Sequence, residues 1–184
     1  MNTPATLVLP AVDLAAAVME TPLGRLTVPA QSIPERRVSV DVTMLLALRD
    51  SARAAAVKAH APYSRFTVGA AAIMADDPDR RIITGVNVEN ATYGATICAE
   101  RNALAQAAAL GLRRLEMLAV SCAQALDAPL ADRSPCGICR QTIAEFAGDD
   151  PATLVLVDGG GADAIGDLLD IDRLLPHGFR LRGI

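Results

Sequence analysis

Three cysteines and one glutamate have the types and spacing of a metal-dependent hydrolytic site. Cys98 and Glu100 are separated by one residue, and Cys136 and Cys139 form a Cys-x-x-Cys pair. At the start of a helix, residues three positions apart lie on one face, and the positive end of the helix dipole lowers the pKa of a thiol. Three thiolates can hold Zn²⁺ tetrahedrally and leave a fourth position for water, which is the pattern of a catalytic site.

Glu100 would add a proton carrier to such a metal site. In the first turn of a helix, Cys98 and Glu100 can both reach a point beyond the helix end. A carboxylate there can accept a proton from a zinc-bound water, whose pKa the metal lowers toward ~7. Taken alone, the pair Cys136 and Cys139 is also compatible with a redox pair or with half of a structural zinc site.

Each cysteine group is predicted to lie at the start of a helix. Residues 98–111 are rich in Ala and Leu and end at Gly111, a residue type that commonly terminates helices. Ser134 and Pro135 suit the N-cap and first helical positions, which predicts a helix over residues 135–146. The other expected elements are a helix over 41–60 capped by Asp41, a helix over 164–175, strands over 66–75, 81–88, 115–121 and 153–157, and a polar loop over 123–133. Alternating strands and helices predict an α/β domain whose sheet is covered by helices.

The first 40 residues differ from the rest of the chain. They hold five of the eleven prolines, in short apolar pieces without a chemical motif. We expect residues 1–40 to form an N-terminal extension, a partly ordered arm or linker with one or two short elements. The catalytic domain is then expected over residues 41–184.

Composition excludes several functional classes. Hydrophobic residues make up 52% of the chain and charged residues 21%, which fits a globular protein rather than a disordered one. The net charge is −4, and 16 of the 17 basic residues are scattered arginines. A polyanion-binding surface needs clustered Lys and Arg, so a nucleic-acid polymer is not expected as a partner.

The chain is also not expected to act at a membrane. No uncharged apolar run approaches ~18 residues, and the first residues lack the basic start of a signal peptide. We therefore expect a cytoplasmic protein, in which thiols stay reduced and cysteines serve as metal ligands or catalytic groups.

Five blocks of sequence, in order, resemble the small zinc-dependent cytidine deaminases of nucleoside salvage. The blocks are residues 61–71 (APYSRFTVGAA), 85–93 (GVNVENATY), 97–104 (ICAERNAL), 134–141 (SPCGICRQ) and 174–179 (LLPHGF). The third and fourth match the zinc-deaminase motif, with Cys in place of His in the first string. The resemblance implies a three-layer α/β/α fold with a mixed central sheet covered by helices.

The resemblance also implies the reaction and the metal. Cys98, Cys136 and Cys139 would bind one zinc ion per chain, and Glu100 would shuttle protons. The implied reaction is hydrolytic deamination of cytidine and 2′-deoxycytidine to uridine and 2′-deoxyuridine, with release of ammonia. Arg101 would donate hydrogen bonds to the sulfurs and offset their negative charge, with Arg140 as a second candidate for this contact.

Substrate contacts follow from the same resemblance. They fall on Phe66, Asn87, Glu89, Tyr93, Ala99 and Phe179. Asn87 and Glu89 match residues that hydrogen-bond the ribose 3′-hydroxyl, Phe66 matches a ring that packs on the substrate, and Ala99 supplies a backbone contact to the base. Tyr93 and Phe179 match positions that help to build sites shared between the subunits of a homotetramer.

Three other functions compete with this interpretation. A deaminase of an aminonucleoside antibiotic of the blasticidin type would share the fold, but Asn87 and Glu89 match a nucleoside sugar contact instead. A non-catalytic, zinc-stabilised binding protein would need no carboxylate near the metal, so Glu100 discriminates against it. A thiol oxidoreductase would be metal-free and would form a reversible disulfide between Cys136 and Cys139.

Overall fold

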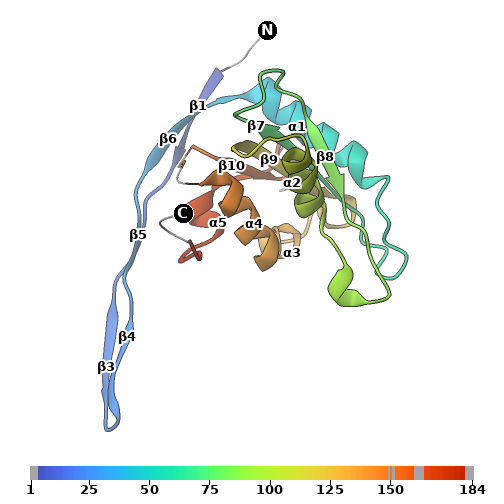
Figure 1. Cartoon of the computed structure of the whole chain (residues 1–184). Helices are drawn as coiled ribbons and strands as arrows, with labels where there is room; N and C mark the ends of the chain where they lie inside the picture. Colours follow the sequence, from blue (N-terminus) through green and yellow to red (C-terminus); the bar gives the residue numbers. More distant parts are fainter. Residues whose placement is uncertain (1–3, 149, 151, 160–163, 181–184) are drawn as a thin grey trace.

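A five-stranded mixed sheet forms the centre of the molecule (Figure 1). The computed structural model describes residues 4–148, 150, 152–159 and 164–180 of the chain. The sheet order is β11-β10-β9-β7-β8, with bounds Asp167–Asp170, Leu154–Val157, Leu115–Cys122, Val68–Met74 and Ile83–Val86. Strands β9 and β10 are parallel, and the other three neighbouring pairs are antiparallel.

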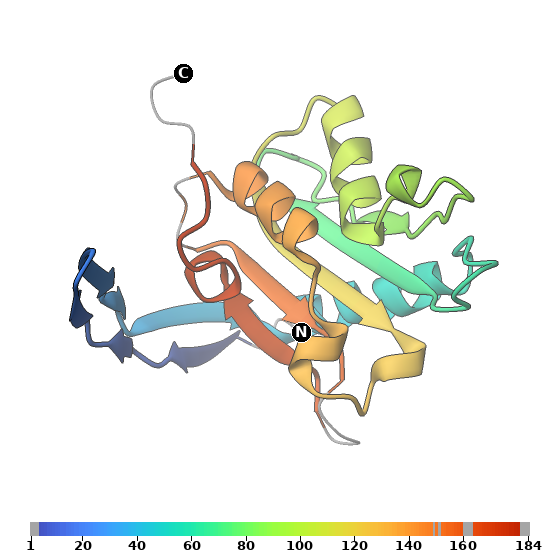
Figure 2. The ribbon, with the colours of Figure 1, turned by 90° about the horizontal axis from the view of Figure 1, so that it is seen from below.

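Helices cover both faces of this sheet, as Figure 2 shows. Helix α1 (Val42–Ala56) packs on one face. On the other face lie α2 (Ala99–Ala109), α4 (Gly137–Ala147) and the short α5 (Ile171–Leu174). Strands β9 and β10 are buried along nearly their whole length because each face meets a helix layer. The predicted three-layer α/β/α fold is confirmed.

Helix α1 begins where the sequence predicts and ends earlier. The Asp41 carboxylate accepts hydrogen bonds from the amides of Thr43 (2.9 Å) and Met44 (3.3 Å), as an N-cap does. The helix ends at Ala56 rather than at His60.

An antiparallel ribbon occupies most of the N-terminal extension. Its strands pair in three successive segments, β1 with β6, β2 with β5 and β3 with β4. Their bounds are Pro4–Leu9 and Arg36–Asp41, Val12–Leu14 and Gln31–Ile33, and Ala17–Thr21 and Gly24–Val28. The prediction of one or two short elements was wrong, because cross-strand pairing organises segments that look too short and proline-rich on their own.

The root of the ribbon belongs to the domain core. Leu9, Val38 and Val40 are buried in one apolar cluster with Leu45 and Leu48 of α1. Part of the predicted extension therefore packs into the core of the predicted catalytic domain. The division into residues 1–40 and 41–184 stays a proposal.

The segment predicted as a helix over 164–175 is part strand and part helix. Strand β11 pairs antiparallel with β10 and completes the sheet edge, and only Ile171–Leu174 is helical. Asp170 ends the strand and caps α5 by accepting the Arg173 amide at 2.9 Å. Residues 160 and 161 of the glycine run lie outside the described residues.

Two smaller predictions also need correction. The N-cap of α4 is Cys136 rather than Ser134, so the helix starts two residues later. The predicted loop over 123–133 contains two short helical turns, η2 (Ala123–Ala125) and α3 (Leu130–Arg133); a third, η1 (Tyr93–Ala95), precedes α2. Among the described residues, no helix has the length and apolar character that crossing a membrane requires.

Candidate metal centre and active site

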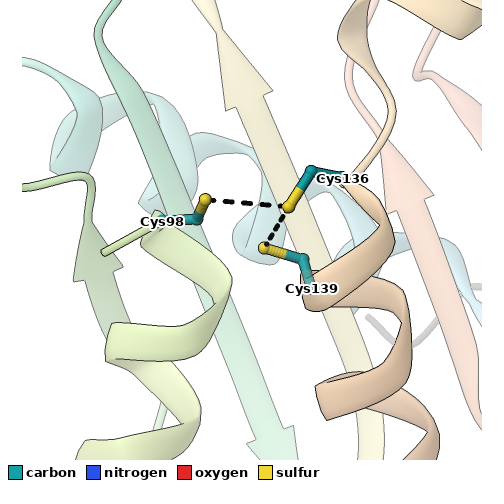
Figure 3. Close-up of side chains that lie close together, drawn as sticks. All are labelled: Cys98, Cys136 and Cys139. Carbon is teal, nitrogen blue, oxygen red and sulfur yellow. Dashed lines mark hydrogen bonds between the residues drawn. The ribbon is translucent and has the colours of Figure 1, made fainter. Parts of the chain in front are cut away.

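The three predicted metal ligands converge where α2 and α4 begin (Figure 3). Cys98 is the N-cap of α2, Cys136 is the N-cap of α4, and Cys139 lies in the first turn of α4. The Sγ atoms are 3.9 Å apart for Cys98 and Cys136 and 3.3 Å apart for Cys136 and Cys139, and all three lie within 4.8 Å of one another. Tetrahedral zinc with Zn–S bonds of ~2.3 Å separates its sulfurs by about 3.8 Å, so the cluster has the right size for this metal.

Close contact with β8 positions the N-terminus of α2. A Cβ atom on Gly85 would lie 2.3 Å from both the Ala99 oxygen and the Ala103 nitrogen, so only glycine allows this approach. The side-chain amides of Asn102 and Gln106 donate to the β8 carbonyls of Val86 (2.7 Å) and Thr84 (2.9 Å). These contacts hold Cys98 and Glu100 at a fixed distance from the sheet.

Arg140 positions the segment before Cys136. Its Nε donates to the Pro135 carbonyl at 2.7 Å, and Nη1 donates to the Leu174 carbonyl of α5 at 3.2 Å. The guanidinium thus bonds to backbone carbonyls, and the structure contains no hydrogen bond from it to a cysteine sulfur among the described residues. Arg140 links the start of α4 to α5.

The pKa values of Cys98 and Cys139 shift in opposite directions. Hydrogen bonds from Cys139 and Cys136 lower the pKa of Cys98 to about 6 despite its burial, and the positive charge of Arg101 acts in the same direction. The hydrogen bond to Cys98, burial and the charge of Glu100 raise the pKa of Cys139. Cys98 therefore ionises more readily than an ordinary thiol. If the two neighbouring cysteines also became thiolates, a cation would be needed to balance the three negative charges.

Arg101 acts on this cluster through its charge. Among the described residues, its guanidinium makes no hydrogen bond to a cysteine sulfur, so the predicted contact stays a prediction. The effect of Arg101 on the pKa of Cys98 agrees with the predicted offset of thiolate charge.

Glu100 is a buried acid beside the cluster. It lies in the first turn of α2, and 3% of its surface is exposed. Burial raises its pKa to about 7, and the negative charge of Cys98 adds to the rise. A carboxyl group with this pKa can take up or release a proton at neutral pH.

A cavity of about 560 Å³ opens in front of Glu100 and the cysteines. Its lining residues are Ser64, Phe66, Val68, Asn87, Glu89, Thr96, Cys98, Glu100, Val120, Cys122, Asp132, Arg133, Ser134 and Cys136. Three of the predicted substrate residues, Phe66, Asn87 and Glu89, are among them. Ala99 is fully buried at the start of α2, and its predicted backbone contact stays a prediction.

Asn87 and Glu89 also hold the chain around Phe66. The Asn87 side chain accepts from the Val68 amide and donates to the Phe66 carbonyl, both at 2.8 Å. Glu89 accepts from the Ser64 hydroxyl and from the amides of Tyr63 (2.9 Å) and Ser64 (3.2 Å). The hydrogen bond from the Ser64 hydroxyl lowers the pKa of Glu89, which keeps it ionised. Their contacts with ribose stay predictions.

Tyr93 and Phe179 lie outside this cavity. Tyr93 is 77% exposed and meets Tyr63 edge to face, with ring centroids 6.3 Å apart. Phe179 is 70% exposed, and its carbonyl accepts from the Gln141 side chain at 2.8 Å. Neither ring contributes to the cavity of its own chain, so their predicted roles depend on a neighbouring subunit.

Sequence reasoning missed the contribution of α3 to the cavity. Asp132, Arg133 and Ser134 line it just before the second zinc string. Arg133 is buried and donates to the carbonyls of Ala128 (3.0 Å), Val157 (3.2 Å) and Asp158 (3.0 Å), and it pairs with Asp167. The one sequence signal for a place in the cavity wall was that this segment directly precedes Pro135 and Cys136.

Comparison with known proteins identifies the family. Residues 45–154 match the model for the cytidine and deoxycytidylate deaminase zinc-binding region. The chain belongs to this family. As a cytidine deaminase family member, it carries the zinc-binding domain of a hydrolytic enzyme, and its three clustered cysteines are suited to that metal.

Individual cytidine deaminases support the assignment. The chain is 39% identical to one from Sporosarcina psychrophila over 76% of this chain and 92% of the relative. It is 40% identical to one from Halalkalibacterium halodurans over 66% of this chain and 83% of the relative. The crystal structure of the enzyme from Burkholderia pseudomallei matches with a TM-score of 0.60 and 38% identity, over 72% of this chain and 97% of that chain. The structure from Mycobacterium tuberculosis matches with a TM-score of 0.58 and 36% identity, over 77% and 99%.

Proposed function

We propose that this chain deaminates cytidine and 2′-deoxycytidine hydrolytically, giving uridine or 2′-deoxyuridine and ammonia. The observation that carries the proposal is the position of Glu100, a buried acid beside three converging thiols, at one wall of a single cavity. A non-catalytic, structural zinc site would have no use for this carboxyl group, and a zinc measurement on the native protein distinguishes the proposed enzyme from a metal-free thiol oxidoreductase.

One zinc ion per chain would be held by Cys98, Cys136 and Cys139. The donor set supports this metal, since three sulfurs at tetrahedral spacing leave a position open toward the cavity. When bound, zinc would supply a nucleophilic hydroxide near neutral pH. The charge of Arg101 would compensate for part of the negative charge of the thiolates.

Glu100 would carry protons through the reaction. It takes one proton from the attacking water and delivers it to ring N3 of cytosine while oxygen bonds to C4. The second proton of the same water passes to the amino group, and the C4–N bond breaks to release ammonia. A pKa of about 7 lets the same carboxyl group accept and donate at each step.

The cavity favours an uncharged nucleoside over its 5′-phosphate. The described lining residues include three acids, Glu89, Glu100 and Asp132, and one base, Arg133. The Arg133 guanidinium is already bonded to carbonyls and to Asp167. A phosphate would bring negative charge toward carboxylates without a free cation to bind it.

Assembly and setting are further parts of the proposal. A homotetramer with shared sites would give the exposed rings of Tyr93 and Phe179 a place in a neighbouring site. A reducing, cytoplasmic setting in pyrimidine salvage would suit the four cysteines, which are all free thiols.

The variant Glu100→Gln tests the mechanism. We expect zinc to remain at one per chain while ultraviolet assays show a loss of kcat of at least about 10²–10⁴-fold, because the amide cannot carry the proton. A panel of cytidine, 2′-deoxycytidine, their 5′-monophosphates and blasticidin S, assayed with the unaltered protein, identifies the substrate. Undiminished turnover by the variant would disprove the role of Glu100, and zinc-loaded protein inactive on every cytosine nucleoside would disprove the function.

A further inference from the structure

Arg133 is a buried cation that lies three residues before a predicted zinc ligand. Only 5% of its side chain is exposed. Its Nε donates to the Ala128 carbonyl at 3.0 Å, and its Nη1 donates to the carbonyls of Val157 (3.2 Å) and Asp158 (3.0 Å). Its Nη2 pairs with the Asp167 carboxylate. The planar guanidinium holds its donors in a fixed fork, so these four contacts fix its position as well as balance its charge.

These contacts dock the α3 segment onto the carboxyl end of β10. Strand β10 ends at Val157, and the Arg133 guanidinium bonds to two successive carbonyls at this end. A second close approach lies nearby in the chain. A Cβ atom on Gly159, where φ is +114°, would lie 2.3 Å from the Leu126 oxygen. The loop before the second zinc string therefore meets the end of β10 at two points, and Arg133 supplies the polar one.

The docked segment leads directly to Cys136. The Ser134 amide donates to the Leu130 carbonyl at 2.9 Å and closes α3, and the ring of Pro135 locks its own φ angle. Cys136 then begins α4 as its N-cap, and its carbonyl accepts from the Arg140 amide at 2.9 Å. In Figure 3 the chain enters α4 at this cysteine. Little torsional freedom therefore remains between α3 and the Cys136 backbone.

Cys136 needs such an anchor more than Cys139 does. Cys139 lies within α4 and is fully buried, so the packing of the helix holds its thiol in place. Cys136 is exposed and lies at the helix boundary, where the helix fixes only the carbonyl side of the residue. The amide side of Cys136 depends on the segment that α3 supplies.

We propose that Arg133 is a positioning residue for the metal centre, which holds the Cys136 thiol within reach of the other two ligands. Loss of the guanidinium would leave three carbonyls and a carboxylate without their donor and would release the α3 segment from β10. The Sγ atom of Cys136 would then no longer be held 3.9 and 3.3 Å from the other two sulfurs. A zinc site tolerates only small displacements of its ligands, so it would bind the metal more weakly. The inference rests on the proposed zinc site and is independent of which nucleoside is the substrate.

Arg173 provides a matched control. It is also a buried arginine, with 9% of its side chain exposed, and it also pairs with one aspartate and donates to three carbonyls. Those carbonyls belong to Leu9, Pro10 and Pro34 of the N-terminal ribbon rather than to a segment beside the cysteines. Arg133→Met and Arg173→Met therefore remove the same kind of contact, and a general loss of stability would affect both.

Zinc transfer to a chelator measures the effect directly. Full-length, zinc-loaded samples of the unaltered protein and both variants are mixed with 4-(2-pyridylazo)resorcinol, and circular dichroism checks that each is folded during the measurement. We expect Arg133→Met to transfer zinc at least about tenfold faster than the unaltered protein, and Arg173→Met to differ from it less than about twofold. Cobalt-substituted samples give a second readout, because the ligand-field bands depend on ligand geometry. These bands should change in Arg133→Met and stay the same in Arg173→Met.

Two lysine variants keep the test decisive if a methionine variant does not fold. Arg133→Lys and Arg173→Lys retain the positive charge, but a single ammonium group cannot reproduce the fork of donors. We expect the first to transfer zinc at least about threefold faster than the unaltered protein and the second to differ less than about twofold. Equal transfer rates for the Arg133 and Arg173 variants would overturn the proposal. Cytidine turnover by the same samples separates the two hypotheses: equal transfer rates with turnover reject the positioning role alone, and zinc-loaded protein without turnover rejects the proposed function alone.

Discussion

At the scale of single residues, Cys98 and Cys122 differ in how well they are placed to bind a metal, although both lie beside the cavity. Both cysteines line it, but only Cys98 lies within 4.8 Å of the other two sulfurs. Cys122 is buried at the end of β9 with its own partner, since its thiol donates to Gln124 at 3.3 Å. Burial raises the pKa of Cys122, which keeps it a neutral thiol.

These two thiols provide a matched test of the metal centre. We expect Cys98→Ser to lose most of its zinc and more than about 100-fold of its turnover, because two thiolates and a hydroxyl hold zinc poorly. Cys122→Ser should retain one zinc per chain. Metal analysis after exposure to a chelator, followed by assays with and without added zinc, measures both effects. Equal zinc in the two variants would show that Cys98 is not a ligand.

Asp158 couples stability to pH away from the metal. Burial raises its pKa, but the hydrogen bonds from Arg53 (2.7 and 2.6 Å) and Ser121 (2.6 Å) outweigh burial and leave the pKa lowered. A carboxyl group with a pKa lowered by folding adds stability above its unfolded pKa of about 3.9. That stability is lost as the pH falls through the lower folded value.

Replacement of Asp158 should remove this contribution. We expect Asp158→Asn to lower the free energy of unfolding at pH 7 by about 2 kcal/mol and to flatten its decline below about pH 4. Asp50→Asn, at an exposed ion pair with Arg49, should change the free energy by less than about 0.5 kcal/mol. Urea denaturation between pH 3 and pH 7 measures both. A parallel pH dependence in the Asp158 variant and the unaltered protein would contradict the assignment.

The sequence predicts the side chains that could bind metal or carry protons better than it predicts the residues that hold them in position. Cys98, Glu100, Cys136 and Cys139 stand out because few residue types bind metal or carry protons, and their spacing can be read directly. Ser64 and Arg133 act through contacts with partners 25 or more positions away in sequence, as in the hydrogen bond from Ser64 to Glu89 and the ion pair of Arg133 with Asp167. Such pairings depend on the folded chain, and local spacing does not reveal them.

At the scale of elements, the site depends on how closely α2 approaches β8. The amides of Asn102 and Gln106 bond to β8 carbonyls, and Gly85 leaves room for the α2 backbone. The sequence predicted both elements, but their separation is a tertiary property. For the same reason, the helix expected over 164–175 is partly strand: Leu168 and Leu169 complete the sheet beside β10, and this pairing overrides local helix preference.

Gly85→Ala should therefore displace α2 from β8. The new methyl group would lie 2.3 Å from backbone atoms of Ala99 and Ala103, and neither can move without the helix. We expect a shift of α2 to weaken zinc binding and to lower kcat at least about tenfold, since catalytic geometry tolerates about 0.5 Å of displacement. Gly94→Ala, which meets no atom within 4 Å, is the control. Equal zinc affinity and turnover in the two variants would show that this close approach is not needed.

At the scale of the whole molecule, the N-terminal ribbon has two parts with different physical roles. Its root contributes Leu9, Val38 and Val40 to the cluster that covers α1. Its tip, β3 and β4, is exposed at every residue except the half-buried Thr21. Composition does not distinguish the root from the tip, because both consist of short apolar segments between prolines. Which segment is buried depends on the fold of the rest of the chain.

Truncation at two positions should separate the roles of root and tip. Removal of residues 1–40 exposes the apolar face of α1 and deletes four buried side chains, Leu9, Ile33, Val38 and Val40, each of which contributes about 1.5–3 kcal/mol. We expect that protein to lose several kcal/mol of unfolding free energy. Replacement of residues 15–30 by a short Gly-Ser turn retains all four of these side chains, and its unfolding free energy should stay within about 1 kcal/mol of the full chain. Denaturation at a protein concentration low enough to keep every sample monomeric makes the comparison independent of assembly. If the protein without residues 1–40 unfolds at the same denaturant concentration as the full chain, the root is not part of the domain core and residues 41–184 form the domain unaided.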